Sequence, residues 1–349
     1  RDLISLIAQR QAIVAEIGEY KINTGTATRD YAREREVLDS TKQQAQLLGL
    51  DPEVAEHVMT ELIRASLAHQ ERSRVAAEST GAGKTALIIG GAGKMGSWMA
   101  GFLASQGYQI EIADPVESAL SFPQISDWTQ SKLEHEIIVV SVPISGTSEI
   151  LSSLADRSPT GLIVDVGSLK TPLAAGFKAL VKSGCRVTSI HPMFGSDTRL
   201  LSGRHVIFVD VGVEEATKEA QSLFASTTVE LINMSLIEHD RLIAYVLGLS
   251  HALNLAFFTA LSESGELAPH LKQLSSTTFD AQLKVASRVA KDNPKLYFEI
   301  QTLNDYGLAP LEALREATSR IQTLVELKDE DGFIALMEAG KDYLDLLAD

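Results

Sequence analysis

The chain has 349 residues, 45% of them hydrophobic, which is enough for two or three domains with substantial cores. A formal net charge of −15 argues against nucleic acid and anionic membranes as main partners. The single cysteine, Cys185, excludes a disulfide framework and indicates a reducing cytoplasm, and the absence of a run of about 18 apolar residues argues against a membrane span.

Residues 1–78 are predicted to form a helical domain, because apolar residues recur at helical spacing. The charged, helix-periodic start RDLISLIAQRQ is unlike a signal peptide. Loop and cap residues divide the domain into three expected helices: one to about Ile22, one from Asp30 to about Leu48, and one from Asp51 and Pro52 to about Glu78.

Two cations lie on the apolar side of the first expected helix. Arg10 and Lys21 are eleven residues apart, so at about 100° per residue they point within about 20° of each other. They share this stripe with Val14 and Ile17, which should face the core. Because buried cations are costly unless they meet anions, the pattern favours a pocket for a small anion. The alternative is that Arg10 extends into solvent along its aliphatic stem.

The other two expected helices carry further polar residues. Ser66 and Gln70 continue the apolar line of the third helix, and they need hydrogen-bond partners if they are buried. Asp30, Arg33 and Glu34 follow an i, i+3, i+4 spacing at the start of the second helix. Together these residues favour a polar pocket between helices that binds a small dianion. The structural alternative is that REREVL forms a solvated, charged helix face.

Residues 79–85, STGAGKT, are interpreted as a linker. GAGKT resembles part of a phosphate-binding P-loop, but Glu78 stands where that motif needs its first glycine. The motif should also follow a strand, whereas a helix is expected here. The segment therefore predicts a flexible connection rather than a nucleotide site.

Residues 86–234 alternate between strand and helix patterns. Apolar, β-branched runs predict six strands: ALIIG, YQIEIAD, IIVVSVP, LIVDVGS, CRVTSI and HVIFVDV. Such strands separated by helices indicate an α/β fold of the Rossmann-like kind, a parallel sheet covered on both faces. Residues 235–349 lose the strand signals and predict an all-helical domain with breaks near Gly265, Asn293 and Gly307.

The first expected strand leads into a glycine loop of the form GxGxxG. Gly91 allows the tight turn, Gly93 lets the backbone approach a pyrophosphate, and Gly96 lets the following helix pack closely. Asp114 ends the second strand, where its carboxylate can bind ribose hydroxyls and would repel a 2′-phosphate. The loop therefore predicts NAD rather than NADP, and the alternative is a glycine-rich turn beside an ordinary strand-end Asp. The remaining residues expected to line the cofactor are Lys94, Met95, Ser141, Val142 and Pro143.

Three later strand ends carry residues that are unusual for strands. Ser141 ends one, Ser168 and Lys170 follow the next, and His191 ends a third, where Pro192 is expected to stop the ladder. Ligands of open parallel sheets bind at this edge. A histidine there could accept a hydroxyl proton while hydride leaves the same carbon. The alternative is a histidine that only marks a turn.

Several of these segments resemble known enzymes. GGAGKMG, SVPIS, DVGSLK and above all HPMFGSD resemble prephenate dehydrogenases, and the N-terminal helices resemble all-helical chorismate mutases. Over essentially the whole chain, the order resembles the bacterial bifunctional chorismate mutase–prephenate dehydrogenases. The resemblance implies a cytoplasmic homodimer with a C-terminal substrate and dimerisation domain. It implies rearrangement of chorismate to prephenate, and then NAD-dependent oxidative decarboxylation to 4-hydroxyphenylpyruvate in tyrosine biosynthesis, without a metal.

The resemblance also implies roles for single residues. In the dehydrogenase, His191 matches the histidine that accepts the proton of the substrate's C4 hydroxyl, with Ser168 and Lys170 beside it. Arg288 matches an arginine that binds a substrate carboxylate, and His239 matches a second histidine of the site. In the mutase, the matching residues are Arg10 and Arg33 for carboxylates, Lys21 and Gln70 for the ether oxygen, Glu34 with Asp30 for the hydroxyl, and Ser66.

Two departures from the family pattern leave alternatives open. A further mutase arginine, which the resemblance implies is donated by a partner subunit, would lie upstream of Arg1. Either the chain continues upstream or the mutase domain is inactive and serves dimerisation. Asp280 stands where related bifunctional enzymes often carry arginine. Arogenate also stays open as the substrate, and more distant alternatives are a β-hydroxyacid dehydrogenase and an NAD-sensing regulator.

Overall fold

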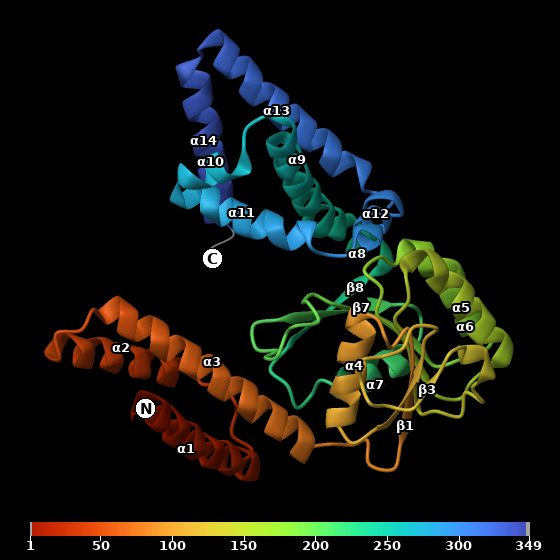
Figure 1. Ribbon diagram of the computed structural model, residues 1–349. Coiled ribbons are helices and arrows are strands. Elements are labelled where there is room, and N and C mark those ends of the chain that lie inside the picture. Colours follow the sequence, from red (N-terminus) through yellow and green to blue (C-terminus); the bar gives the residue numbers. More distant parts are fainter. Residues whose placement is uncertain (1, 347–349) are drawn as a thin grey trace. The chain divides into compact units, whose positions relative to one another are not determined.

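The computed structural model describes residues 2–346 (Figure 1). The chain divides into two compact units, Arg1–Leu236 and Ile237–Asp349. The first unit holds three N-terminal helices and an eight-stranded sheet with its covering helices, and the second is helical. The expected combination of a helical, a Rossmann-like and a second helical region is therefore confirmed.

The N-terminal helices begin where their cap residues predict. Asp30 accepts a hydrogen bond from the Arg33 N–H, and Asp51 accepts one from the Glu53 N–H, so each satisfies a backbone donor in the first turn of its helix. The third helix packs against both of the others. The three helices are α1 (Asp2–Thr24), α2 (Tyr31–Leu47) and α3 (Pro52–Ala77).

The side of α1 that is buried differs from the side that the apolar pattern of the sequence predicts. Gly18 is buried, and a Cβ added there would lie 2.9 Å from Cγ of Gln70, whereas Ile17 is 45% exposed. The expectation that Ile17 faces the core is therefore wrong. Gly18 lies about 80° around the helix from Arg10, and Ile17 lies about 20° from Arg10 on the other side. Arg10 still reaches α3 because its side chain is long.

The sheet follows the order β3-β2-β1-β4-β5-β6-β7-β8. All adjacent pairs are parallel except β6 and β7, so the expectation of a wholly parallel sheet is wrong at this end. The 12 residues 193–204 form no helix, and such a connection leads back as an antiparallel neighbour rather than a crossover. The strands are β1 (Thr85–Ile89), β2 (Gln109–Ala113), β3 (Gln124–Ile125), β4 (Ile137–Val140), β5 (Leu162–Asp165), β6 (Val187–Pro192), β7 (His205–Asp210) and β8 (Glu230–Ser235).

Strands β3 and β8 were not expected from the sequence. β3 has only two residues, and β8 is an edge strand whose residues are exposed or half-buried. Neither therefore shows the continuous apolar run by which the six inner strands were found.

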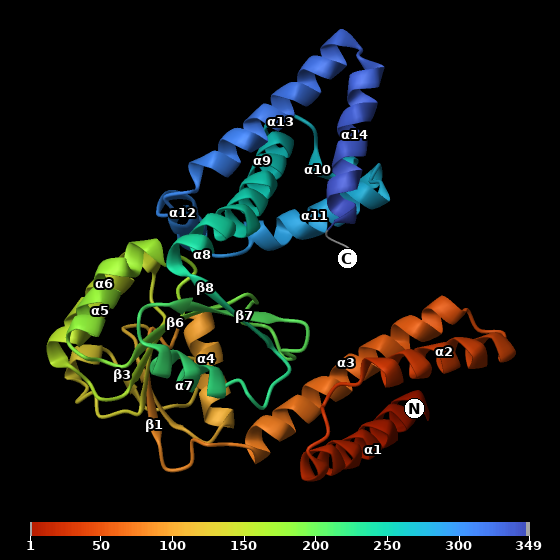
Figure 2. The same ribbon diagram turned by 180° about the vertical axis from the view of Figure 1, so that it is seen from behind.

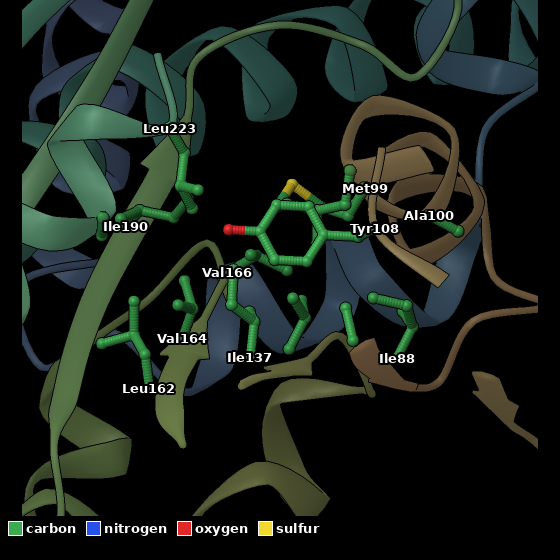
Figure 3. Close-up of a cluster of buried hydrophobic side chains, with 14 of the residues drawn as sticks. Ile88, Met99, Ala100, Tyr108, Ile137, Leu162, Val164, Val166, Ile190 and Leu223 are labelled. Atoms are coloured by element: carbon green, nitrogen blue, oxygen red, sulfur yellow. The ribbon is translucent and has the colours of Figure 1, made fainter. Parts of the chain in front are cut away.

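Helices cover both faces of the sheet (Figures 1 and 2). Side chains of α4 and α7 share one buried cluster with inward-facing residues such as Ile88, Ile137 and Val164 (Figure 3). α5 and α6 pack against each other on the opposite face, as right-handed crossovers on the two sides of β1 require. These helices are α4 (Lys94–Ser105), α5 (Ile144–Arg157), α6 (Ala174–Lys182) and α7 (Glu214–Ser222), and two 3₁₀ segments are η1 (Trp128–Gln130) and η2 (Thr171–Leu173).

The second unit breaks where the sequence predicts. Gly265 has φ +80°, Asn293 caps a helix by accepting the Lys295 N–H, and Gly307 precedes a long helix. Its elements are α8 (Leu236–Ile243), the π-helical η3 (Ala244–Leu249), α9 (Ser250–Glu263), α10 (Ala268–Gln273), α11 (Thr277–Ala290), α12 (Pro294–Thr302), α13 (Leu308–Leu327) and α14 (Glu330–Asp345).

One stretch among the described residues, Leu236–Glu263, is long and apolar enough to cross a membrane by length and composition alone. The sequence has no unbroken apolar run here, because Ser250, His251 and Asn254 interrupt it. Only 28% of its apolar window is buried within the chain. The stretch therefore presents an apolar surface that one copy of the chain leaves open.

Candidate active sites

The glycine loop has the close packing that a dinucleotide site needs. A Cβ at Gly91 would lie 2.8 Å from a methyl carbon of Ile112, and one at Gly96 would clash with the Gly90 carbonyl. Glycine is therefore required where the loop crosses β2 and where α4 starts. Gly93 is the N-cap of α4, so the N-terminus of this helix follows the loop directly.

Asp114 is tied to the same loop. Its carboxylate accepts a 3.0 Å hydrogen bond from the Ala92 N–H and a 2.9 Å hydrogen bond from the Val116 N–H. Asp114 directly follows β2 and is 9% exposed, so these two hydrogen bonds fix its carboxylate beside the glycine loop. The loop and this acid fit NAD, with the acid placed for ribose hydroxyls.

The other expected cofactor residues lie on elements beside the loop. Ser141 follows β4 and donates its N–H to the Ile89 carbonyl at 2.8 Å, and its own carbonyl lies against Gly90. The remaining residues lie in the first turn of α4 and ahead of α5: Lys94, Met95, Val142 and Pro143.

His191 lies in β6, three strands away from β1 in the sheet, and is 5% exposed. The expectation that Pro192 stops the ladder is wrong. Pro192 pairs with Val206, and Met193 donates its N–H to the His205 carbonyl at 2.9 Å. A proline fits here because the adjacent residues carry the antiparallel hydrogen bonds. His191 is therefore held on both sides by paired backbone.

Lys170 occupies a different place from the one expected. Its side chain is 0% exposed, and Nζ donates 2.7 Å hydrogen bonds to Oδ2 of Asp165 and to the Ile190 carbonyl. Ser189 also donates a hydrogen bond to the Asp165 carboxylate, at 2.8 Å. No surface of Lys170 is left for a substrate, so direct substrate contact is not supported. The pair instead fixes the backbone directly before His191.

Sequence reasoning missed two members of this cluster, Asp165 and Ser189. Both are 0% exposed on the neighbouring strands β5 and β6. The available signal was a carboxylate inside the apolar run LIVDVGS, because a buried acid requires a partner. Ser168, in contrast, is half-buried on the loop after β5 and stays available as a ligand.

In the second unit, the expected histidine is already engaged. His239 is 0% exposed, its Nδ1 lies 2.7 Å from Oδ1 of Asp240, and the Asp240 carbonyl accepts a hydrogen bond from Asn304. Its complete burial does not support direct substrate contact. Arg288, in contrast, is exposed in the last turn of α11.

A second histidine of this unit was missed. His251, on α9, stacks on Tyr297 with ring centroids 4.0 Å apart, and its buried Nδ1 has no hydrogen-bond partner among the described residues. Burial lowers the pKa of His251, and the charge of Asp292 offsets part of this effect. The only sequence signal was a histidine interrupting an apolar helix.

Asp280 has a local structural role. It lies in the first turn of α11, where a negative charge is favourable, and it accepts a 2.5 Å hydrogen bond from Ser275. The carboxylate therefore stabilises the start of this helix.

Three of the expected mutase residues come together between α1 and α3. Arg10 donates hydrogen bonds to Oγ of Ser66 at 2.6 Å and to the Leu62 carbonyl at 3.2 Å. Gln70 donates from Nε2 to the Val14 carbonyl at 3.2 Å, while its buried Oε1 has no partner among the described residues. Burial lowers the pKa of Arg10. These contacts place the three residues on the facing sides of α1 and α3, and a substrate pocket between the two helices stays a prediction.

The other mutase residues do not join this cluster within one chain. Lys21 donates to the Thr28 carbonyl at 2.7 Å. Arg33 points to solvent and pairs with Glu36 at 2.8 Å, with both side chains about two-thirds exposed. Asp30 caps α2, and Glu34 is held by Arg29.

Three family models match successive parts of the chain. Residues 1–71 match chorismate mutase type II, residues 111–233 match the nucleotide-binding domain of prephenate dehydrogenase, and residues 236–339 match its dimerization domain. Two bacterial T-proteins match nearly end to end. That of Enterobacter agglomerans is 27% identical over 337 residues, 95% of this chain and 87% of the relative. That of Haemophilus influenzae is 27% identical over 347 residues, 98% of this chain and 89% of the relative.

Solved structures share the fold of the sheet domain and of the C-terminal helical unit. A prephenate dehydrogenase from A. aeolicus, solved with hydroxyphenyl propionate and NAD⁺, covers 75% of this chain and 98% of its own, with a TM-score of 0.62 and 19% identity. A Synechocystis arogenate dehydrogenase covers 75% of this chain and 99% of its own, with a TM-score of 0.57 and 20% identity.

An isomerase domain joined to an NAD-dependent oxidoreductase is thus the class of enzyme that the fold and the matches define. Within that class, the chain belongs to the bifunctional chorismate mutase–prephenate dehydrogenases, enzymes of tyrosine biosynthesis. These matches argue against the β-hydroxyacid dehydrogenase and the NAD-sensing regulator.

Proposed function

We propose that the chain converts chorismate to prephenate between its N-terminal helices, and prephenate to 4-hydroxyphenylpyruvate at the sheet. The placement of His191 carries the proposal. It lies on β6, in the sheet whose first strand leads into the glycine loop. The carboxyl ends of parallel strands lie along one edge of a sheet, so a histidine on β6 and a cofactor at the loop share that edge.

At this edge, prephenate would lose hydride from C4 and carbon dioxide from C1, and formation of the aromatic ring favours the products. NAD, when bound, supplies the hydride acceptor. His191 takes the C4 hydroxyl proton as hydride leaves that carbon, and the phenol product regains a proton. The buried Asp165–Lys170 pair supports this step because Lys170 also bonds the Ile190 carbonyl beside His191.

The remaining dehydrogenase residues are assigned by their exposure. Ser168, half-buried beside Lys170, is proposed to bind the substrate next to His191. Arg288, exposed on α11, is proposed to bind a substrate carboxylate. His239 is proposed to position α8 through its contact with Asp240.

The mutase reaction is a unimolecular rearrangement, which needs no nucleophile. Catalysis then comes from holding a compact substrate and stabilising charge on the ether oxygen. Arg10, Ser66 and Gln70 support such a pocket as they stand. Lys21 and Arg33 are proposed to exchange their present partners for the substrate.

We further propose a cytoplasmic homodimer in which the helices of two copies complete the mutase pockets. Supporting this, the N-terminal helices expose apolar side chains that a second copy would cover: Leu3, Ile4, Leu6, Ile13, Ile17, Tyr20, Tyr31, Leu47, Leu48, Val54 and Val58. The C-terminal unit also leaves apolar residues open, among them Val246, Phe298 and Met337. The single buried cysteine suits the cytoplasm.

The test is to add chorismate and NAD to the purified chain and follow NADH. NADH from chorismate supports both activities. NADH from prephenate but not from chorismate selects a dehydrogenase with an inactive mutase domain. NADH from arogenate alone changes the assigned substrate, and NADH from none of the three overturns the proposal.

A further inference from the structure

The loop that follows β6, residues 193–204, reaches the mutase helix α3. Glu71 is 4% exposed on α3 and directly follows Gln70. Its Oε1 accepts the Leu201 N–H at 2.8 Å, and its Oε2 accepts the Thr228 hydroxyl at 2.8 Å. A buried carboxylate held by neutral donors loses stability when any of them moves away. The position of Gln70 is therefore tied to the loop.

The same loop holds a second mutase residue. Arg29 grips Glu34 with two parallel hydrogen bonds, from Nε to Oε1 at 2.8 Å and from Nη2 to Oε2 at 3.0 Å. Its remaining nitrogen, Nη1, donates to Oγ of Ser202 at 2.7 Å, and its guanidinium lies 4.2 Å from the centre of the Tyr31 ring. The planar guanidinium therefore links the Glu34 carboxylate rigidly to Ser202.

These two contacts come from neighbouring residues of one loop. Leu201 holds Glu71, beside Gln70, and Ser202 holds Arg29, which orients Glu34. The loop leaves β6 two residues after His191, so it belongs to the dehydrogenase domain. None of the four residues that form these contacts has been assigned a role in catalysis or in cofactor binding.

We propose that Arg29 and Glu71 are positioning residues of the mutase site, and that the dehydrogenase loop 193–204 holds them in place. The proposal rests on the proposed mutase roles of Glu34 and Gln70. It makes the mutase dependent on the dehydrogenase domain, while the dehydrogenase does not depend on Arg29 or Ser202. Arg29 acts through Glu34 and touches no reacting atom.

The test is a double-mutant cycle in the full chain. Ser202→Ala is expected to raise the KM for chorismate about threefold to tenfold with kcat little changed, the loss expected for one ordinary hydrogen bond. Arg29→Gln should raise KM further, and Arg29→Lys, which keeps the charge but not the fork, should fall between. Adding Ser202→Ala to Arg29→Gln should have no further effect, because the link is already broken. Glu71→Gln tests the second contact and should also impair only the mutase.

Controls separate this proposal from a general loss of folding. Arg64→Gln breaks an exposed Arg64–Glu61 pair on the same domain and should change neither activity. Additive effects in the cycle, unchanged mutase kinetics, or equal loss of NADH formation from prephenate would each overturn the inference. A parent enzyme that does not consume chorismate overturns the proposed mutase as well, whereas an active parent with unaffected variants overturns this inference alone.

Discussion

The two candidate sites differ in what holds them in place. His191 and Asp165 lie on strands whose neighbouring residues are buried in the core of their own sheet, and Lys170 reaches Asp165 from the segment that follows β5. Arg10, Ser66 and Gln70 lie between two helices that bury few residues and expose many apolar ones. The dehydrogenase centre is thus fixed from within its domain, whereas the mutase pocket depends on what surrounds it. Changes in the sheet should therefore act on one activity, and changes at the helix surfaces on the other.

The largest separation is expected for His191→Asn. Loss of the proton acceptor should lower the dehydrogenase turnover about 10²–10⁴-fold, while mutase activity stays nearly unchanged. NADH formation from prephenate and chorismate consumption would be measured on the same preparation. If both activities fell together, or neither fell, the assigned role of His191 would be wrong.

Lys170→Met tests whether the buried pair supports the sheet. Removing one partner leaves the Asp165 carboxylate buried and uncompensated, which costs about 3–5 kcal/mol of unfolding free energy. Urea denaturation would measure the loss. The double variant Asp165→Asn with Lys170→Met should recover part of it, because no unpaired charge remains. Equal instability of the single and double variants would contradict the pairing argument.

Ile17→Asp probes the opposite case, a change at an exposed helix surface. Because Ile17 is 45% exposed, the folded monomer should change by no more than about 0.5 kcal/mol. A dimer that buries it should lose about 1.5–3 kcal/mol, a tenfold or larger rise in the dissociation constant, together with mutase activity. Sedimentation over a range of concentrations checks this. Glu19→Gln, on the other side of α1, is the matched control and should leave the dimer intact.

The sequence could predict the features that depend on residues close together in the chain. The Asp30 and Asp51 caps, the glycine loop with Asp114 and the inner apolar strands all depend on short segments, and the structure has them as expected. The sequence could not predict the features that depend on contacts between segments far apart in the chain. The direction of β7 depends on how a loop returns, and the burial of Lys170 depends on β5 and β6 lying side by side.

Ile17 shows the same limit on the scale of one helix. Its position on the apolar stripe was correct, but which part of the stripe meets α3 is decided by Gly18 and Gln70. A helix with apolar residues over a wide arc does not indicate which of them a single chain buries. The residues left over, Ile17 among them, are those for which a partner surface is proposed.

The smallest effect is expected from pH, through His251. Burial holds its folded pKa below the ordinary value, so the unfolded chain takes up the proton first as pH falls. Unfolding then becomes easier as pH falls through the ordinary histidine pKa of about 6.5 and on toward the lower folded value, and no such loss arises above it. His251→Gln, which cannot titrate, should flatten the fall in unfolding free energy across this range. Urea midpoints for parent and variant at several pH values measure the difference, and parallel pH profiles would show that His251 is not buried as a neutral group.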